Sequence, residues 1–229
     1  MRTMLTSAMT ALLILVCAPA HASSLGNLVT NGDFESGPVG FGSDYSYVTP
    51  EIDNCWSPGT FTVTTSAANC HSLWESSGDH MTGAGNAMFI NGRTDKTSSV
   101  WLGEFAVTPN TDYVFEAFVK NVCCNYGSFA NSALLFYAND TLLGSAGSGA
   151  AGIWEQATSI WNSASTTLVA LRAVSQSTVF HSNDYGLDDV YFGEVATTPT
   201  PEPATMGLLL TGLGLVARRV RRRRNQQSV

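Results

Sequence analysis

Basic residues are almost absent from the middle of this 229-residue sequence. Between residues 23 and 200 seventeen acidic residues stand against four basic ones, so the net charge of this stretch is near −13. The four basic residues are Arg93, Lys96, Lys120 and Arg172. A strongly negative surface repels phosphate backbones and anionic lipid, so the composition excludes a nucleic-acid partner. It also favours divalent cations.

Helical periodicity is lacking over the same stretch, and short runs with β-strand character take its place. Residues 112–121 alternate, with Tyr113, Phe115, Ala117 and Val119 on one face. Further runs, bounded by Gly, Asn, Asp, Ser or Pro, are 86–91, 100–107, 132–137, 141–144, 154–161, 167–173 and 185–192. Strands at this spacing predict an all-β fold, a β-sandwich or jelly roll, over residues 23–195.

The first 22 residues predict a signal peptide. Arg2 supplies the positive start, residues 11–16 form an apolar core, and Ala20 and Ala22 are small residues at a cleavage site. Signal peptidase is therefore the expected first processing partner. Cys17 leaves a lipoprotein open as an alternative, although bulky Val16 stands where a small residue is preferred.

The C-terminal end predicts a transient membrane anchor. Residues 196–203 form an extended linker that contains the motif Pro201-Glu202-Pro203, and residues 204–217 are apolar. As a helix, these fourteen residues span roughly 21 Å, less than a ~30 Å hydrocarbon core. Residues 218–229 then contain six arginines, which hold this end on the cytoplasmic side of the inner membrane.

This arrangement resembles the PEP-CTERM sorting signal of Gram-negative bacteria that make extracellular polymer. The resemblance implies cleavage near Pro-Glu-Pro by a membrane-embedded exosortase. We therefore expect an exported protein that reaches the cell surface or the extracellular space.

Four cysteines remain after removal of the signal peptide, and an exported domain with an even number indicates disulfide bonds. They are Cys55, Cys70, Cys123 and Cys124. The pair Cys55–Cys70 is weakly favoured because it closes a short loop. On a strand, Cys123 and Cys124 would point to opposite faces and take separate partners. In a loop they could bond to each other.

Three motifs in order carry a second resemblance. They are residues 27–37 (NLVTNGDFESG), residues 100–118 with the turn at 108–111, and residues 183–190 (NDYGLDDV). Together they resemble the galactose-binding-like jelly rolls, in particular the carbohydrate-binding modules of families 4 and 9. The resemblance covers residues 25–194 and is stronger evidence for fold than for ligand.

The related modules carry a structural calcium ion. The resemblance implies the Asp33 carbonyl, the Glu35 carboxylate and the Asp188 carboxylate as its ligands, contributed by the first and last strands. Carboxylate and carbonyl oxygens are the type of ligand that Ca²⁺ prefers, and the ion takes about 6–8 of them. Asp189 should face away, because successive residues of a strand point to opposite sides. The alternative is that these groups make turn and surface hydrogen bonds without a metal.

Sugar binding needs exposed aromatic faces flanked by hydrogen-bonding groups. Aromatic residues in polar, loop-like surroundings are the candidates, with nearby amides and a carboxylate. The set is Tyr45, Tyr47, Trp74 and Tyr126, with Asn125, Asn183 and Asp184. Five other aromatic residues are expected in the core, namely Trp56, Trp101, Phe115, Trp154 and Phe180.

Signs of catalysis are few. No nucleophile elbow accompanies His71, His80 or His181, and the group Cys70, His71, Asp79 and His80 matches no zinc-site spacing. The sequence therefore predicts no catalytic residues, and a non-catalytic module that binds extracellular polysaccharide. The alternatives are a structural matrix protein that acts through protein–protein contacts, and a small glycoside hydrolase.

Overall fold

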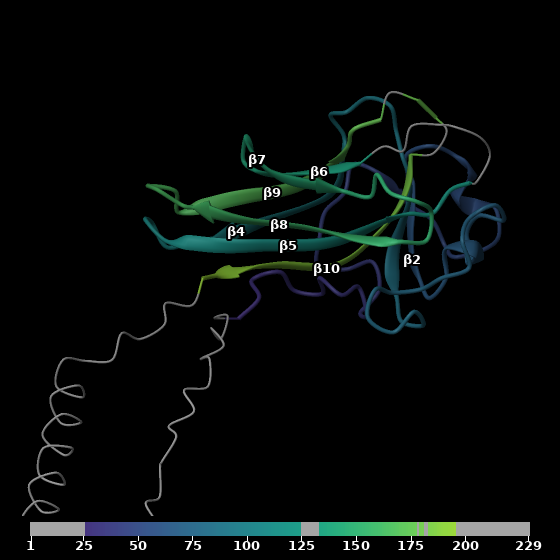
Figure 1. Ribbon diagram of the computed structural model, residues 1–229, viewed down its shortest axis with the longest axis horizontal. Coiled ribbons are helices and arrows are strands. Elements are labelled where there is room, and N and C mark those ends of the chain that lie inside the picture. The colour runs from purple at the N-terminus through teal and green to yellow at the C-terminus, as the bar shows by residue number, and fades with distance from the viewer. Residues whose placement is uncertain (1–25, 125–132, 178, 181–182, 196–229) are drawn as a thin grey trace, which may run out of the picture. The chain divides into compact units, whose positions relative to one another are not determined.

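The computed structural model describes residues 26–124, 133–177, 179–180 and 183–195, which lie in one compact unit, Ser24–Ala196. The described residues form a jelly-roll β-sandwich of two sheets, with two short 3₁₀ turns, η1 (Asn54–Trp56) and η2 (Ala67–Asn69) (Figure 1). The six-stranded sheet has the order β1 (Ser46–Tyr47), β2 (Thr60–Thr64), β3 (Ala87–Asn91), β10 (Asp184–Glu194), β5 (Asp112–Asn121) and β8 (Trp154–Asn162). The four-stranded sheet has the order β4 (Ser99–Ala106), β9 (Leu168–Ser175), β6 (Leu134–Ala138) and β7 (Thr141–Ala146).

The main core lies between the two sheets. On β5 the predicted alternation is confirmed, since Tyr113, Phe115, Ala117 and Val119 are all buried in this core. Their neighbours on β5 face the outer side of the six-stranded sheet. The eight strand runs predicted between residues 86 and 192 are present as β3 to β10, and β1 and β2 are additional.

The N-terminal segment packs along β10, as expected for the two ends of a jelly roll. The Leu28 amide donates to the Phe192 carbonyl at 2.8 Å, and the Val190 amide donates to the Gly32 carbonyl at 2.9 Å. A Cβ on Gly32 would lie 2.0 Å from the Val190 carbonyl oxygen, so only glycine allows this approach. The sequence predicts Asp33 and Glu35 in a first strand and its turn; the segment is a series of turns with no strand, which corrects the strand part of that expectation.

A β-bulge interrupts β10 where this segment docks. The register with β5 shifts between Asp188 and Tyr191, and Asp189 has φ 47°. A bulge changes the direction in which a side chain points. The Asp189 side chain therefore does not follow the strand alternation that the sequence predicts for it.

Residues 65–86, here called the cap, cover part of the outer face of the six-stranded sheet. A second apolar cluster lies beneath the cap, separate from the main core, and contains Cys70, Trp74, Phe89 and Val122. This second core explains why outward-facing positions of β3 and β5 are buried. The cap does not cover the opposite part of the same face, where Ile160 of β8 is 66% exposed.

Lys120 anchors the cap to the sheet. Its side chain is fully buried, and Nζ donates to Ser77 Oγ at 2.7 Å and to the Gly78 carbonyl at 2.8 Å. The ammonium group also lies 4.4 Å from the centre of the Trp154 ring. Burial lowers the pKa of Lys120 to about 8, although Asp188, Asp79 and Glu75 oppose the shift.

We expect Lys120→Ala to lower the free energy of unfolding by about 1–3 kcal/mol, because a buried carbonyl loses its partner and the stem loses its packing. Lys120→Met keeps the stem and should lose less. Urea denaturation of the two variants and the parent measures the difference. Equal stability of the alanine variant and the parent would show that Lys120 does not hold the cap.

The described residues contain no helix that is both long and apolar enough to cross a membrane. The predicted signal peptide (1–22), the Pro201-Glu202-Pro203 motif, the apolar segment 204–217 and the arginine-rich end 218–229 lie outside the described residues.

Candidate functional site

The most distinctive surface feature is an exposed tryptophan that lies on a buried aromatic stack. Trp56 is 55% exposed, which corrects the expectation that it lies in the core. Its ring is parallel to that of His71, with centroids 4.5 Å apart and an interplanar angle of 2°. His71 in turn stacks on Trp74 at 4.9 Å. We call Trp56, His71 and Trp74 the aromatic ladder.

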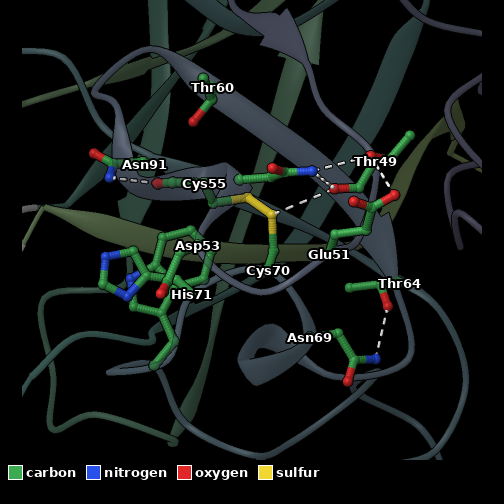
Figure 2. The surroundings of a disulfide bond; sticks show 12 residues. Thr49, Glu51, Asp53, Cys55, Thr60, Thr64, Asn69, Cys70, His71 and Asn91 are labelled. Carbon is green, nitrogen blue, oxygen red and sulfur yellow. Dashed lines mark hydrogen bonds between the residues drawn. A yellow bond between two sulfur atoms is a disulfide. The ribbon is translucent and has the colours of Figure 1, made fainter.

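A disulfide bond holds the upper two rings of the ladder together. Cys55 bonds to Cys70, so their sequence neighbours Trp56 and His71 are brought side by side. The Cys55 amide also donates to the Cys70 carbonyl at 3.1 Å, and Asn91 Nδ2 donates to the Cys55 carbonyl at 2.8 Å. Figure 2 shows His71 beside this bond, with Asn91 tying Cys55 to strand β3. The weakly favoured Cys55–Cys70 pairing is therefore confirmed.

The lowest ring of the ladder is fixed to the sheet. Trp74 is only 4% exposed, and its Nε1 donates to Asp184 Oδ2 at 3.0 Å. Asp184 lies on β10 and is almost fully buried. Burial raises the pKa of Asp184 to about 7, while the hydrogen bond from Trp74 opposes the rise.

The middle ring is held in one orientation. His71 Nδ1 accepts a hydrogen bond from the Leu73 amide at 3.2 Å, which requires the neutral ring with its proton on Nε2. Burial lowers the pKa of His71, and the charge of Asp53 opposes this. The ladder therefore contains a neutral imidazole at neutral pH.

Polar groups lie beside the ladder. Asp53, two residues before Cys55, accepts hydrogen bonds from the Ser72 hydroxyl at 2.8 Å and from the Ser72 amide at 3.1 Å. These bonds lower the pKa of Asp53, so its carboxylate stays charged and able to accept further bonds. An exposed indole face beside a carboxylate and a hydroxyl can stack on the apolar face of a sugar ring and accept bonds from its hydroxyl groups.

A second feature, a pocket of about 530 Å³, lies at the β10 bulge. His80 and Glu116 line it together with Phe118 and Asp189. His80 Nδ1 lies 2.8 Å from Asp189 Oδ2, and the His80 ring stacks on Phe118 with centroids 3.6 Å apart. The bulge thus directs Asp189 towards His80 of the cap, and Glu116 lines the same pocket.

The predicted sugar-binding residues fall into different environments. Tyr45 lies in the main core, where its hydroxyl accepts a bond from the Arg93 amide at 2.9 Å. Tyr47 is 44% exposed on β1. Trp74 and Asp184 are brought together, but both are buried and support the surface from below.

Asn183 is also buried, and its Nδ2 donates to the Gly92 carbonyl at 3.0 Å. Asn125 and Tyr126 lie outside the described residues. Among the aromatic residues expected in the core, Phe180 is 63% exposed, so that expectation is wrong for it as for Trp56.

Trp56 is the residue that the sequence reasoning missed. It follows a cysteine directly and lies in a stretch rich in turn formers, Asp53-Asn54 before it and Ser57-Pro58 after it. Such a stretch indicates a surface turn. The Cys55–Cys70 pairing carries a second signal, since it places the residue after each cysteine, Trp56 and His71, side by side.

The residues of the predicted calcium site make hydrogen bonds within the protein. Glu35 Oε1 accepts a bond from the Asn86 amide at 2.9 Å, and Asp33 Oδ1 accepts one from the Glu35 amide. Asp188 is buried, and its two oxygens accept bonds from the His80 and Asp189 amides. Among the described residues no group of three or more His, Cys, Asp or Glu side chains could hold a metal. The calcium site, which also needs a main-chain oxygen, stays a prediction.

The other two cysteines, Cys123 and Cys124, are bonded to each other just after β5. This is the loop alternative that the sequence left open. Cys123 packs against the second apolar cluster, and the Val122 carbonyl accepts a bond from the Glu75 amide at 3.0 Å. The Cys123–Cys124 disulfide therefore lies against the cap.

No protein-family model matches the sequence, and no curated protein matches it. Solved structures that resemble the fold include the CBM22-1–CBM22-2 tandem domain of Xyn10C from Paenibacillus barcinonensis, at 13% identity and TM-score 0.48, covering 79% of this chain and 49% of that one. A cyclase from Fischerella sp. has 14% identity and TM-score 0.48, with 78% and 100% covered. The sugar-binding C-terminal domain of EclA has 14% identity and TM-score 0.39, with 46% and 76% covered. Likeness at this level carries no functional argument, so function has to come from the residues of the site.

Proposed function

We propose that this protein is an exported, non-catalytic carbohydrate-binding module that associates with extracellular polysaccharide or with the cell surface. The observation that carries the proposal is the indole of Trp56, exposed to solvent yet stacked on a buried ring. A sugar-binding aromatic residue has to be accessible and rigid at once. The disulfide and the ladder supply the rigidity.

The charge of the domain narrows the class of polymer. Residues 23–200 carry a net charge near −13, and the carboxylate of Asp53 lies beside the ladder. A polyanionic polysaccharide would be repelled. The ligand we propose is therefore a neutral or cationic glycan.

The sorting role belongs to the same proposal. The signal peptide would direct export, and the Pro-Glu-Pro segment would hold the protein transiently in the inner membrane until an exosortase cleaves it. A structural calcium ion at Asp33, Glu35 and Asp188 would fasten the two ends of the domain without taking part in binding.

Affinity electrophoresis of the protein through gels that contain single polysaccharides tests the binding role. We expect retardation by at least one neutral or cationic polymer and none by polyuronates. Free migration through every polymer, including the one made by the source cells, would contradict the proposal. Mass spectrometry of the mature C-terminus tests the sorting role separately.

A second candidate, a small glycoside hydrolase, is favoured by the pocket at the β10 bulge. Glu116 and Asp189 line this pocket together, and hydrolysis of a glycosidic bond commonly uses two carboxyl groups. Release of reducing ends from a retained polymer, lost in Glu116→Gln, would favour this candidate. Binding without release favours the non-catalytic module.

A further inference from the structure

The buried end of the aromatic ladder is hydrogen-bonded to the carboxyl group of Asp184. Asp184 Oδ2 accepts the Trp74 indole proton at 3.0 Å, Trp74 stacks on His71, and His71 stacks on the exposed Trp56. Each of these steps is a direct contact between two side chains. A single chain of contacts therefore joins a carboxyl group on the central strand β10 to the proposed sugar-binding face.

We propose that Asp184 is a positioning residue that makes the Trp56 surface respond to pH near neutrality. The proposal rests on the proposed function for its biological meaning, but its physical content concerns the ladder alone. Asp184 is 4% exposed, so a negative charge there is poorly solvated. Its oxygen is at the same time the acceptor that fixes Trp74.

The surroundings of Asp184 offer no opposite charge among the described residues. The hydrogen-bond donor is Nε1 of Trp74 in the cap, and Oδ1 of Asp184 has no hydrogen-bond partner in the part of the chain that the structure describes. On β5 the nearest cation along the sheet is Lys120, whose ammonium group is bound instead by Ser77 and Gly78. Neither His71 and Glu75 of the cap nor Arg93 after β3 shifts the pKa of Asp184.

The direction in which stability changes with pH follows from the direction of the pKa shift of Asp184. Burial raises the pKa of Asp184 from its ordinary value to about 7, so the folded state holds the proton more tightly than the unfolded chain. The contribution of Asp184 to the free energy of unfolding is therefore favourable at acid pH, and it is lost as the pH rises through about 7. The cap should therefore hold the ladder less firmly at pH 8 than at pH 6.

Three other groups titrate near the cap. Burial raises the pKa of Asp188 to about 7 as well, with the same sign as for Asp184, but Asp188 binds the His80 amide of the cap and not the ladder. The pKa of His71 is lowered by burial, so its protonation disturbs the ladder only on the acid side of the ordinary histidine range. The pKa of Lys120 is about 8, and loss of its proton favours the folded state, which is the opposite sign. A loss of ladder order between pH 6 and 7.5 is assigned to Asp184, which binds Trp74, when it is absent in Asp184→Asn, since that variant keeps Asp188.

The test is a pH titration of the intact protein, followed by the indole ¹H–¹⁵N resonances of its tryptophans. We expect the signals of Trp74 and Trp56 to move together with a midpoint near pH 7 and to stay fixed between pH 6 and 7.5 in Asp184→Asn. Asp140→Asn, which removes an exposed carboxyl from the β6–β7 turn, should titrate as the parent does.

Trp74→Phe supplies a second variant, since it keeps a ring but removes the donor to Asp184. In this variant the Trp56 signal should no longer respond between pH 6 and 7.5. Movement of Trp74 without Trp56, or no movement of either, overturns the proposal. Because no glycan is present, these results do not depend on whether the protein binds sugar. If it does, affinity should be several-fold higher at pH 6 than at pH 8 in the parent and equal in Asp184→Asn.

Discussion

Trp56→Ala should abolish most of the glycan affinity and leave the fold intact. Loss of a central aromatic contact typically weakens binding by about 2 kcal/mol or more, roughly 30-fold. Since Trp56 is more than half exposed, its removal should change the free energy of unfolding by less than about 1 kcal/mol. Isothermal titration with the polymer that retards the protein, together with urea denaturation, measures both quantities.

Two further variants sharpen this result. Ile160→Ala removes an apolar side chain of comparable exposure from the uncovered part of the same sheet, and it should bind as the parent does. Trp56→Phe keeps an aromatic face and should retain an intermediate affinity. If Trp56→Ala and Ile160→Ala bind equally well, the ladder is not the sugar-binding surface.

Cys55→Ala/Cys70→Ala should lower the free energy of unfolding by about 3 kcal/mol. The bond links residues 15 positions apart, and closing a loop of this length restricts the unfolded chain by about that amount. The same change frees Trp56 from its place over His71. Glycan affinity should therefore fall as well, even under conditions in which the variant remains folded.

The matched control is Cys123→Ala/Cys124→Ala. These cysteines are adjacent, so their bond closes no intervening loop and constrains the unfolded chain little. We expect a loss of less than about 1 kcal/mol. Equal losses in the two double variants, measured by urea denaturation, would rule out loop closure as the source of the stability.

The strands could be predicted because their signal is local. Residues 112–121 alternate between core and outer face, and the structure confirms each inward position. The two strands that the sequence reasoning did not identify have weaker patterns. Thr60–Thr64 is buried on both faces, with Thr60 bonded to Ser57 and Thr64 to Asn69 of the cap, and Ser46–Tyr47 has only two residues.

The site could not be predicted because it depends on contacts between distant segments. Trp74 and Asp184 are both candidates from the sequence, but their hydrogen bond spans 110 positions and buries both of them. The exposure of Trp56 depends on a disulfide partner fifteen residues away. Propensity and alternation report on neighbours along the chain, so they cannot show which aromatic residue a cap covers.

The bulge on β10 shows the same limit for charged residues. Strict alternation places Asp188 and Asp189 on opposite faces, and it does not anticipate the extra residue. With the bulge, Asp188 Oδ2 accepts a hydrogen bond from the main-chain amide of His80, and Asp189 Oδ2 accepts one from Nδ1 of the His80 ring. The two acids thus hold one residue of the cap between them.

The five tryptophans allow one measurement of where a glycan binds. An oligosaccharide of the retained polymer is added to ¹⁵N-labelled protein, and the five indole signals are followed. The ladder predicts the largest shift at Trp56, a smaller one at Trp74, and none at Trp101 or Trp161, which lie in the main core. A shift confined to Trp154, near the pocket with His80, or no shift of Trp56 in a complex shown to form, would contradict the account.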